Sequence, residues 1–271
     1  MRLCQLGEIV FIGLGLHDEQ GISVRGLKEA QDADAAFIEL YTNLLPDFSL
    51  KRLEQMIGKR LAVVSRRELE DKSGEVVLSA AKVGKTVLLV PGDPLVATTH
   101  VALRIEAAKR GIRSRVVHGA SILSAVVGLS GLHNYKFGKT VTVPFPADNP
   151  SDTPYEVVLQ NKRLGLHTLC LLDVKAEEKR FLSINEALKT LMETETAKRK
   201  GAVTGDSLVV GVARAGSDAP AVKAGYARDV INLDFGGPPQ CIVFPGRLHF
   251  MEADALIFLA GAPEAVRGMI E

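Results

Sequence analysis

The first half of the chain alternates short apolar runs with longer amphipathic segments, and no other feature constrains the fold as strongly. The strand-like runs are residues 9–12, 36–41, 61–64, 86–90 and 116–117. The helix-like segments between them are residues 23–30, 50–57, 76–83 and 95–109. Strands and helices that alternate through short connections predict a parallel sheet with helices on both faces.

The run at residues 86–90 is apolar at every position after Thr86, as expected for a strand that is buried on both faces. Sheets of this kind bind ligands outside the carboxyl ends of their strands, near the point where the strand order reverses. The turns that follow the strands are therefore where a ligand site is expected.

The second half of the chain differs from the first in composition, since residues 133–150 are rich in Gly, Pro and Asn. Further strand-like runs are residues 141–145, 168–172, 208–213 and 241–244. Helices are expected over residues 183–198, which open with a capping-box pattern, and over 250–259. We predict two α/β domains: residues 1–118 with a mostly parallel sheet and residues 119–271 with a mixed sheet.

The charges of the chain nearly cancel, with 33 Lys and Arg against 32 Asp and Glu. A broad basic surface for nucleic acid is therefore not expected. No apolar run approaches the roughly 18 residues of a membrane span, so we predict a cytoplasmic protein that binds no membrane. The six His and three Cys lack the spacing of a metal site, and no metal is expected.

The strongest local motif is residues 90–100, Val-Pro-Gly-Asp-Pro-Leu-Val-Ala-Thr-Thr-His, directly after a predicted buried strand. Asp93 and Pro94 have the pattern of a helix N-cap followed by the first helical residue. Gly92 would let a ligand approach the main chain closely. A capped turn alone explains Asp93 and Pro94 but not the Thr-Thr-His that follows, which favours a ligand site.

Two more glycine turns follow predicted strands. The first, Gly13-Leu14-Gly15-Leu16, would need a third glycine at the position of Asp18 to match a dinucleotide-binding fingerprint. The other begins Gly119-Ala120-Ser121-Ile122, where Ser121 could also cap a helix. Each turn alone has a plain structural explanation, but three at the carboxyl ends of three strands indicate one shared pocket.

Taken in order, the motifs of this chain resemble the diphthine synthase family, a branch of the tetrapyrrole-methylase-like enzymes. The resemblance covers nearly the whole chain. Its segments are residues 11–16, 39–42, 91–100, 131–138, 166–169, 172–177, 213–217, 234–239, 245–249 and 261–263.

The resemblance implies a bilobal α/β fold, a homodimer, and S-adenosyl-L-methionine bound in a cleft between the domains, with S-adenosyl-L-homocysteine as product. It also implies the reaction, which is repeated methyl transfer to the amino nitrogen of a modified histidine on translation elongation factor 2. The trimethylated product, diphthine, belongs to diphthamide biosynthesis.

The family's cofactor contacts fall on eight positions of this sequence: Leu16, Asp93, Val96, Ser121, Ile122, Leu172, Ala215 and Gln240. The last position is commonly a histidine, so either its main chain makes the contact here or the adenosine is bound differently. Asp93 could accept a hydrogen bond from a ribose hydroxyl or from the methionine ammonium. No catalytic residue is assigned, although Asp173, Arg214 and His249 could either line the acceptor side or have structural roles.

Three other functions compete with this interpretation. A methylase of a tetrapyrrole precursor usually has a Gly-Pro-Gly-Asp-type first loop, whereas this chain has Gly15-Leu16-His17-Asp18. A nicotinamide-dependent oxidoreductase is disfavoured by the missing third glycine. A binding protein of the same fold would bind the cofactor without turning it over.

Overall fold

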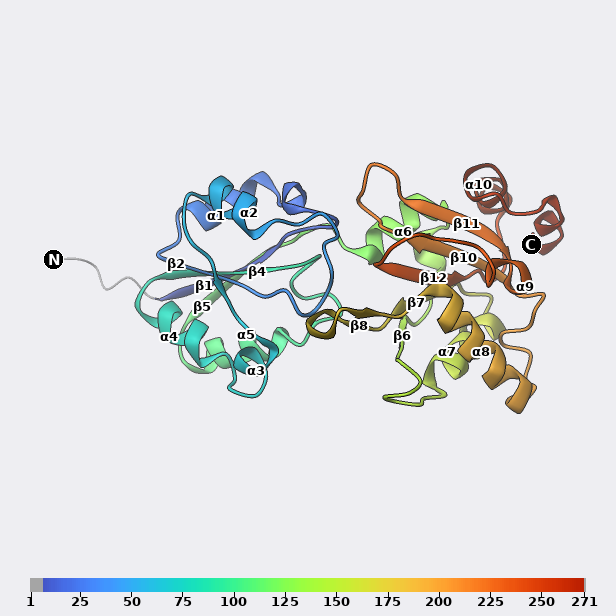
Figure 1. Ribbon diagram of the computed structural model, residues 1–271, viewed down its shortest axis with the longest axis horizontal. Coiled ribbons are helices and arrows are strands. Elements are labelled where there is room, and N and C mark those ends of the chain that lie inside the picture. Colours follow the sequence, from blue (N-terminus) through green and yellow to red (C-terminus); the bar gives the residue numbers. More distant parts are fainter. Residues whose placement is uncertain (1–6, 271) are drawn as a thin grey trace. The chain divides into compact units, whose positions relative to one another are not determined.

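The computed structural model describes residues 7–270, which divide into two compact units (Figure 1). The first unit runs as far as Ile122 and also takes in Lys175–Glu178. The second unit comprises Leu123–Val174 and the chain from Lys179 onward. The domain limits 1–118 and 119–271 remain a prediction.

The first unit contains a five-stranded sheet in the order β3-β2-β4-β1-β5, and every neighbouring pair is parallel. Its strands are β1 (Glu8–Gly13), β2 (Ala35–Ile38), β3 (Ala62–Val63), β4 (Lys85–Val90) and β5 (Arg113–Val117). Its helices are η1 (Glu19–Gly21), α1 (Val24–Gln31), α2 (Leu50–Ile57), α3 (Arg66–Leu69), α4 (Glu75–Val83) and α5 (Val101–Lys109). The prediction of a parallel sheet in this half is confirmed.

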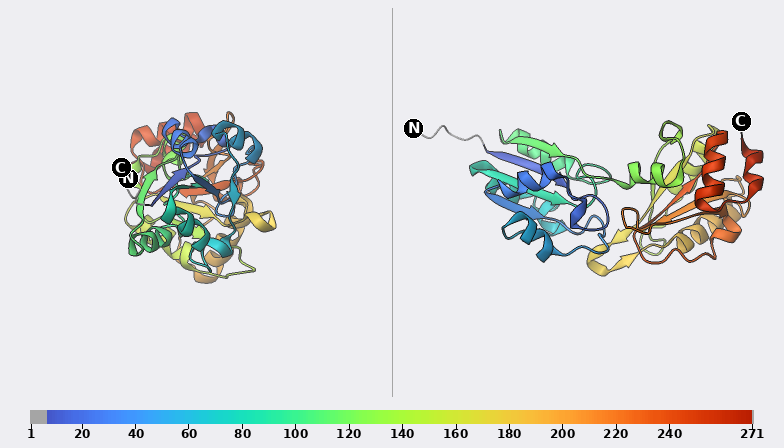
Figure 2. Two further views of the ribbon diagram at one scale, coloured as in Figure 1. Left: turned by 90° about the vertical axis from the view of Figure 1, so that its left-hand side faces the viewer. Right: turned by 90° about the horizontal axis from the view of Figure 1, so that it is seen from above.

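Helices cover both faces of this sheet, because its central strands are apolar on both sides (Figures 1 and 2). Val10 and Ile12 of β1 pack in the cluster that holds residues of α1 and α2. Ile9 and Phe11, which point to the opposite face, pack with residues of α4 and α5. All six residues of β1 are buried, as expected for the centre of a parallel sheet.

The strand order reverses between β1 and β4, which are neighbours. The chain leaves β1 for β2, on the far side of β4, and leaves β4 for β5, on the far side of β1. The two connections therefore run in opposite directions across the sheet. The carboxyl ends of β1 and β4 flank the position where such sheets bind ligands.

The helix predicted over residues 95–109 is wrong in its first part. Residues 94–100 form turns, and α5 begins at Val101 with His100 as its N-cap, so Asp93 is no cap and Pro94 is not helical. Ala97 lies in the left-handed region with φ of 56°, which ends any helical path from Pro94. The Oγ1 of Thr98 and the Nδ1 of His100 both donate to the carbonyl of Pro94.

The second unit contains a five-stranded sheet in the order β11-β10-β12-β7-β6. Its strands are β6 (Val141–Val143), β7 (Thr168–Leu172), β10 (Leu208–Ala213), β11 (Ala221–Tyr226) and β12 (Gln240–Phe244). Only β6 and β7 pair in parallel, so the predicted mixed sheet is confirmed. A short pair, β8 (Val174–Lys175) and β9 (Arg180–Phe181), forms a separate two-stranded sheet.

The helices of this unit are α6 (Ile122–Ser130), η2 (Asn134–Lys136), α7 (Thr153–Arg163), η3 (Ala176–Glu178), α8 (Ile184–Lys198), α9 (Ala227–Val230), α10 (Phe250–Ala260) and η4 (Glu264–Met269). Of these helices, η3 lies within the Lys175–Glu178 segment that belongs to the first unit, and α6 begins with Ile122, the last residue of that unit before Leu123. Helix α8 begins with the predicted capping box of Ser183 and Glu186. Within residues 7–270, no helix is both long enough and apolar enough to span a membrane.

Candidate functional site

The three glycine turns of the first unit meet at the carboxyl edge of its sheet. Gly15 and Gly92 exchange two main-chain hydrogen bonds, with N–O distances of 3.1 and 2.8 Å. A Cβ added to Gly13 would lie 2.5 Å from the Gly92 oxygen and 2.6 Å from the Gly119 nitrogen. Only glycine allows the main chains that follow β1, β4 and β5 to approach this closely.

Asp93 is the buried acidic residue of these turns, with 6% of its surface exposed. Its Oδ1 accepts a hydrogen bond of 3.0 Å from the main-chain N–H of Leu95. Its Oδ2 lies 2.7 Å from the Nδ1 of His118, which directly follows β5. Each carboxylate oxygen can accept more than one hydrogen bond, so Asp93 keeps acceptor capacity for a ligand.

The other predicted contacts of the first unit occupy the same three turns. Leu16 and Val96 are half-buried residues of the turns after β1 and β4. Ser121 and Ile122 are half-buried at the start of α6, after β5. The sheet topology thus gathers five positions from three separate stretches of the sequence, although it does not by itself show what they bind.

These residues suit the chemistry of S-adenosylmethionine. The cofactor offers hydroxyl and ammonium donors, for which the buried Asp93 carboxylate is an acceptor. Leu16, Val96 and Ile122 offer apolar surface for an adenine. A Cβ built on Gly92, whose φ is 73°, would meet no atom within 4 Å, so the main chain there borders open space.

The three predicted contacts of the second unit gather at one end of its sheet. Leu172 is the last residue of β7, and Gln240 is the first residue of the neighbouring antiparallel strand β12. Ala215 follows β10, whose last residue, Ala213, pairs with Gln240. Leu172 and Ala215 are buried, and Gln240 is half-buried.

The side chain of Gln240 is engaged in the second unit itself. Its Oε1 accepts a hydrogen bond of 2.9 Å from the N–H of Ile184, the first residue of α8. Its Nε2 donates to the Gly236 carbonyl at 2.7 Å. The amide thus bridges a helix N-terminus and a loop, which favours a main-chain contact over a side-chain contact at this position.

The polar residues that the sequence suggested for the acceptor side all have local structural partners. The Asp173 carboxylate accepts from the N–H groups of Val174 and Phe145. Arg214 donates to the Phe235 carbonyl at 2.7 Å. His249 caps α10, its Nδ1 accepting from the N–H of Met251 at 3.3 Å. None of these contacts assigns a general base.

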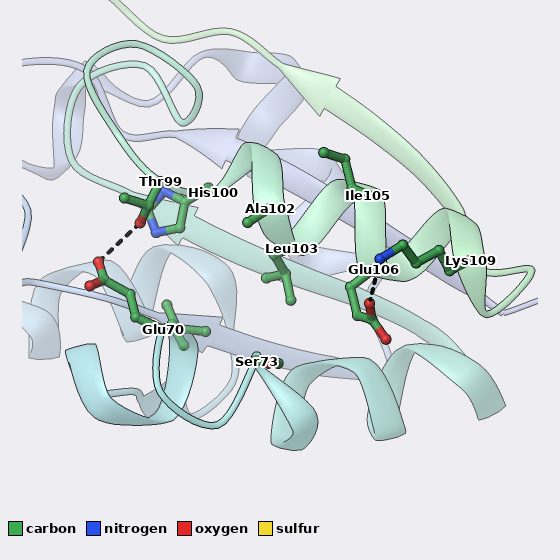
Figure 3. Close-up of a pocket in the computed structure, with 10 residues that line it drawn as sticks. Glu70, Ser73, Thr99, His100, Ala102, Leu103, Ile105, Glu106 and Lys109 are labelled. Atoms are coloured by element: carbon green, nitrogen blue, oxygen red, sulfur yellow. Dashed lines mark hydrogen bonds and ion pairs between the residues drawn. The ribbon is translucent and has the colours of Figure 1, made fainter.

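A cavity of about 390 Å³ lies between α5 and the connection from α3 to α4 (Figure 3). Thr99 and His100 line it, and the Thr99 hydroxyl donates to the Glu70 carboxylate at 2.9 Å across one end. Burial lowers the pKa of His100, whose ring is 2% exposed. None of the predicted cofactor contacts lines this cavity, so Thr99 and His100 face a different hollow from the three glycine turns.

The sequence interpretation missed a buried ionic network in the second unit. Glu252 of α10 is fully buried and accepts hydrogen bonds from the Nζ of Lys136 and the Nε2 of His167, at 2.7 and 2.9 Å. The N–H groups of His133 and His249 donate to the same carboxylate. The network ties together three of the motifs that carry the family resemblance, which explains those motifs structurally.

Among residues 7–270, one group of side chains has the spacing of a possible metal site. Ligand atoms of His17, Asp18 and Asp47 lie within 4.8 Å of one another. Asp18 is already engaged as the cap of η1, accepting from the N–H of Gln20 at 2.9 Å.

Comparison with known proteins gives a consistent result. The family model of tetrapyrrole (corrin/porphyrin) methylases matches residues 8–230. The diphthine synthase of Methanosarcina mazei is 45% identical over 269 residues, covering 97% of this chain and 100% of the relative. That of Methanocaldococcus jannaschii is 45% identical over 254 residues, covering 93% and 98%.

Solved structures of diphthine synthases are also similar to this chain. A crystal structure of diphthine synthase superposes with a TM-score of 0.88 at 39% identity, covering 97% of this chain and 100% of the other. A putative diphthine synthase from Entamoeba histolytica gives a TM-score of 0.84 at 34% identity, covering 95% and 100%. Both similarities extend over both units of the chain.

Proposed function

The chain belongs to the tetrapyrrole methylase family, in its diphthine synthase branch, and from this premise we propose that it methylates translation elongation factor 2 with S-adenosylmethionine. The acceptor is the amino group of the modified histidine, and three transfers give the trimethylated diphthine of diphthamide biosynthesis. The observation that carries the proposal is 45% identity to a diphthine synthase along the whole length of that relative.

The cofactor contacts are proposed in both units. In the first unit they are Leu16, Asp93, Val96, Ser121 and Ile122, which lie in the three turns described above. In the second unit they are Leu172, Ala215 and Gln240. The convergence of the glycine turns at the strand reversal supports the first group, and the shared end of the sheet supports the second.

The chemistry of the methyl donor determines what the protein must contribute to the reaction. Bound S-adenosylmethionine supplies a methyl group that is already activated for transfer. Asp93 would hold the cofactor by accepting hydrogen bonds, and the apolar side chains beside it would exclude water. The main contribution of the protein is therefore orientation of the two reactants. The acceptor amine must be unprotonated when it attacks.

The experiment uses purified protein, S-adenosylmethionine labelled in its methyl group, and elongation factor 2 that carries the unmethylated intermediate. We expect label on the factor, and mass spectrometry to show three added methyl groups. A cobalt-precorrin-type ring serves as the competing acceptor. No label on the factor, while a known diphthine synthase labels the same batch, would refute the proposal.

Membership of this family also suggests the oligomeric state, the location and the metal requirement of the chain. We propose a homodimer in the cytoplasm that needs no metal and binds neither nucleic acid nor membrane. Sedimentation equilibrium should then give twice the chain mass of 29.1 kDa. Chelation with EDTA should leave the transfer rate unchanged.

A further inference from the structure

We infer that His118 is a positioning residue that fixes the orientation of the Asp93 carboxylate for cofactor binding. This inference rests on the proposed function, because it concerns the same site. His118 is not among the family's cofactor contacts, and in the sequence it is one of six scattered histidines. Its connection to the site becomes visible only when β4 and β5 are placed in the sheet.

The contact between the two side chains is direct. The Nδ1 of His118 lies 2.7 Å from the Oδ2 of Asp93, although the residues are 25 positions apart. A carboxylate can only accept, so Nδ1 must carry the hydrogen of this bond. The Nδ1 of His118 is therefore the donor and the Oδ2 of Asp93 the acceptor.

The side chains of Asp93 and His118 differ in their exposure to solvent. The side chain of Asp93 is 6% exposed, whereas that of His118 is 76% exposed. His118 therefore contributes little to packing. Val117, the preceding residue, is 6% exposed and anchors the end of β5 in the core, which fixes where the His118 main chain lies.

The hydrogen bond matters because a carboxylate turns easily about its last bond. The χ2 torsion of aspartate is broad, so packing alone sets the carboxylate plane weakly. Leu95 N–H holds one oxygen of Asp93, and His118 holds the other. With both bonds present the plane is fixed, and the remaining lone pairs point in defined directions. Without His118 one constraint remains.

The test compares three variants at His118 by calorimetry with S-adenosylhomocysteine. His118→Asn keeps a donor nitrogen close to the position of Nδ1. His118→Gln carries its nitrogen close to the position of Nε2, and His118→Ala carries none. We expect the Ala and Gln variants to bind about tenfold more weakly, which is the lower end of the loss seen when the outer partner of a metal ligand is removed. The Asn variant should bind within about twofold of the native chain, since it restores the donor.

Each outcome bears on the inference. If His118→Ala binds as tightly as the native chain, or if His118→Asn is as weak as His118→Ala, the inference is wrong while the proposed function stands. If the native chain itself binds no S-adenosylhomocysteine, the proposed function fails and the inference fails with it. Thermal unfolding without ligand should show a folded chain in all four proteins, because the His118 ring is mostly exposed.

Discussion

At the scale of single residues, the site depends on main-chain atoms that only glycines allow to meet. A Cβ on Gly119 would lie 2.4 Å from the Gly92 oxygen and 2.9 Å from the Gly13 carbonyl carbon. Both neighbours are main-chain atoms, Gly13 at the end of β1 and Gly92 shortly after β4, so neither can shift without moving the end of a strand. We expect Gly119→Ala to lower the free energy of unfolding by roughly 1–3 kcal/mol and to weaken cofactor binding.

Gly128 in α6 provides the matched control. A Cβ there would meet no atom within 4 Å, and alanine favours a helix over glycine by about 0.5–1 kcal/mol. Gly128→Ala should therefore raise stability. Urea unfolding followed by circular dichroism measures both, since the chain has no Trp. Equal effects of the two substitutions would contradict the close approach of the turns.

Glu252 makes the stability of the second unit depend on pH. Burial alone would raise its pKa, but hydrogen bonds from His249, Lys136, His133 and His167 lower the pKa from 4.5 to about 2. A lowered pKa in the folded state means that the carboxylate stabilises the fold above pH 4.5. This contribution is lost as the pH falls from 4.5 toward 2.

We expect Glu252→Gln to cost roughly 2–3 kcal/mol of unfolding free energy at pH 7, because it leaves Lys136 without its buried partner. The difference from the native chain should shrink below pH 4.5 and vanish near pH 2. Asp254→Asn on the same helix is the control, since its pair with Arg267 is half exposed and should contribute less than about 1 kcal/mol. A Glu252→Gln cost that is constant from pH 7 to pH 3 would rule out this explanation.

At the scale of elements, the start of α5 shows how tertiary contacts override a local pattern. Asp93 and Pro94 have the sequence of a helix start, yet Asp93 is engaged with His118 and Ala97 adopts a φ of 56°. Ala97 is exposed, so a substitution there acts through the main chain alone. We expect Ala97→Gly to raise stability by about 0.5–1 kcal/mol, because glycine tolerates the left-handed region.

The sign of this effect is diagnostic. If residues 95–109 formed one continuous helix, the same substitution would lower stability by about 1 kcal/mol. Ala102→Gly, at an exposed position inside α5, should lower it and serves as the control. Urea midpoints at constant slope are the measurement. A destabilised Ala97→Gly variant would mean that the helix begins before Val101.

Elements with strong local patterns were predictable from the sequence. Helix α2 has the predicted limits, with Gly58 as its left-handed C-cap, and β7 matches its predicted range of residues 168–172. Strand β11 and helix α7 were not predicted. The β11 sequence Ala-Val-Lys-Ala-Gly-Tyr has no continuous apolar run, and it is a strand because it pairs with β10 at the sheet edge.

The site was predictable to the extent that topology determines it. Parallel strands end at one edge of their sheet, so the turns near Leu16, Asp93 and Ser121 could be expected to meet. The partnership of Asp93 with His118 and that of Glu252 with Lys136 could not. Both depend on distances between residues far apart in the chain, and neither leaves a periodic trace in the sequence.

At the scale of the whole molecule, each of the two units has an apolar core of its own among the described residues. A large cluster in the second unit holds residues of β7, β10, β12 and α8, whereas the first unit has a cluster on each face of its sheet. Each unit also gathers its own group of proposed cofactor contacts at one end of its sheet. A ligand that binds the folded chain and not the unfolded chain stabilises the fold. We therefore expect the bound cofactor to raise the free energy of unfolding.

The size of that change follows from mass action. A ligand at a hundredfold excess over its Kd raises the free energy of unfolding by about 2.7 kcal/mol. In a chain of this size each kcal/mol corresponds to a rise in Tm of roughly 2–4 °C. S-adenosylhomocysteine at this excess should therefore raise the Tm of the native chain by several degrees.

Asp93→Asn tests whether the shift arises at the proposed site. The amide keeps the shape of the carboxylate. Its oxygen can still accept from Leu95 N–H, and its NH2 group can donate to an unprotonated Nδ1 of His118, so the Tm without ligand should change little. It lacks the negative charge, and a tenfold weaker Kd would reduce the stabilisation at the same ligand concentration to about half. Scanning calorimetry of both proteins, with and without S-adenosylhomocysteine, gives the four values needed. An equal rise in Tm in the two proteins would remove Asp93 from the cofactor contacts. It would leave the proposed reaction standing, because methyl transfer to elongation factor 2 is assayed separately.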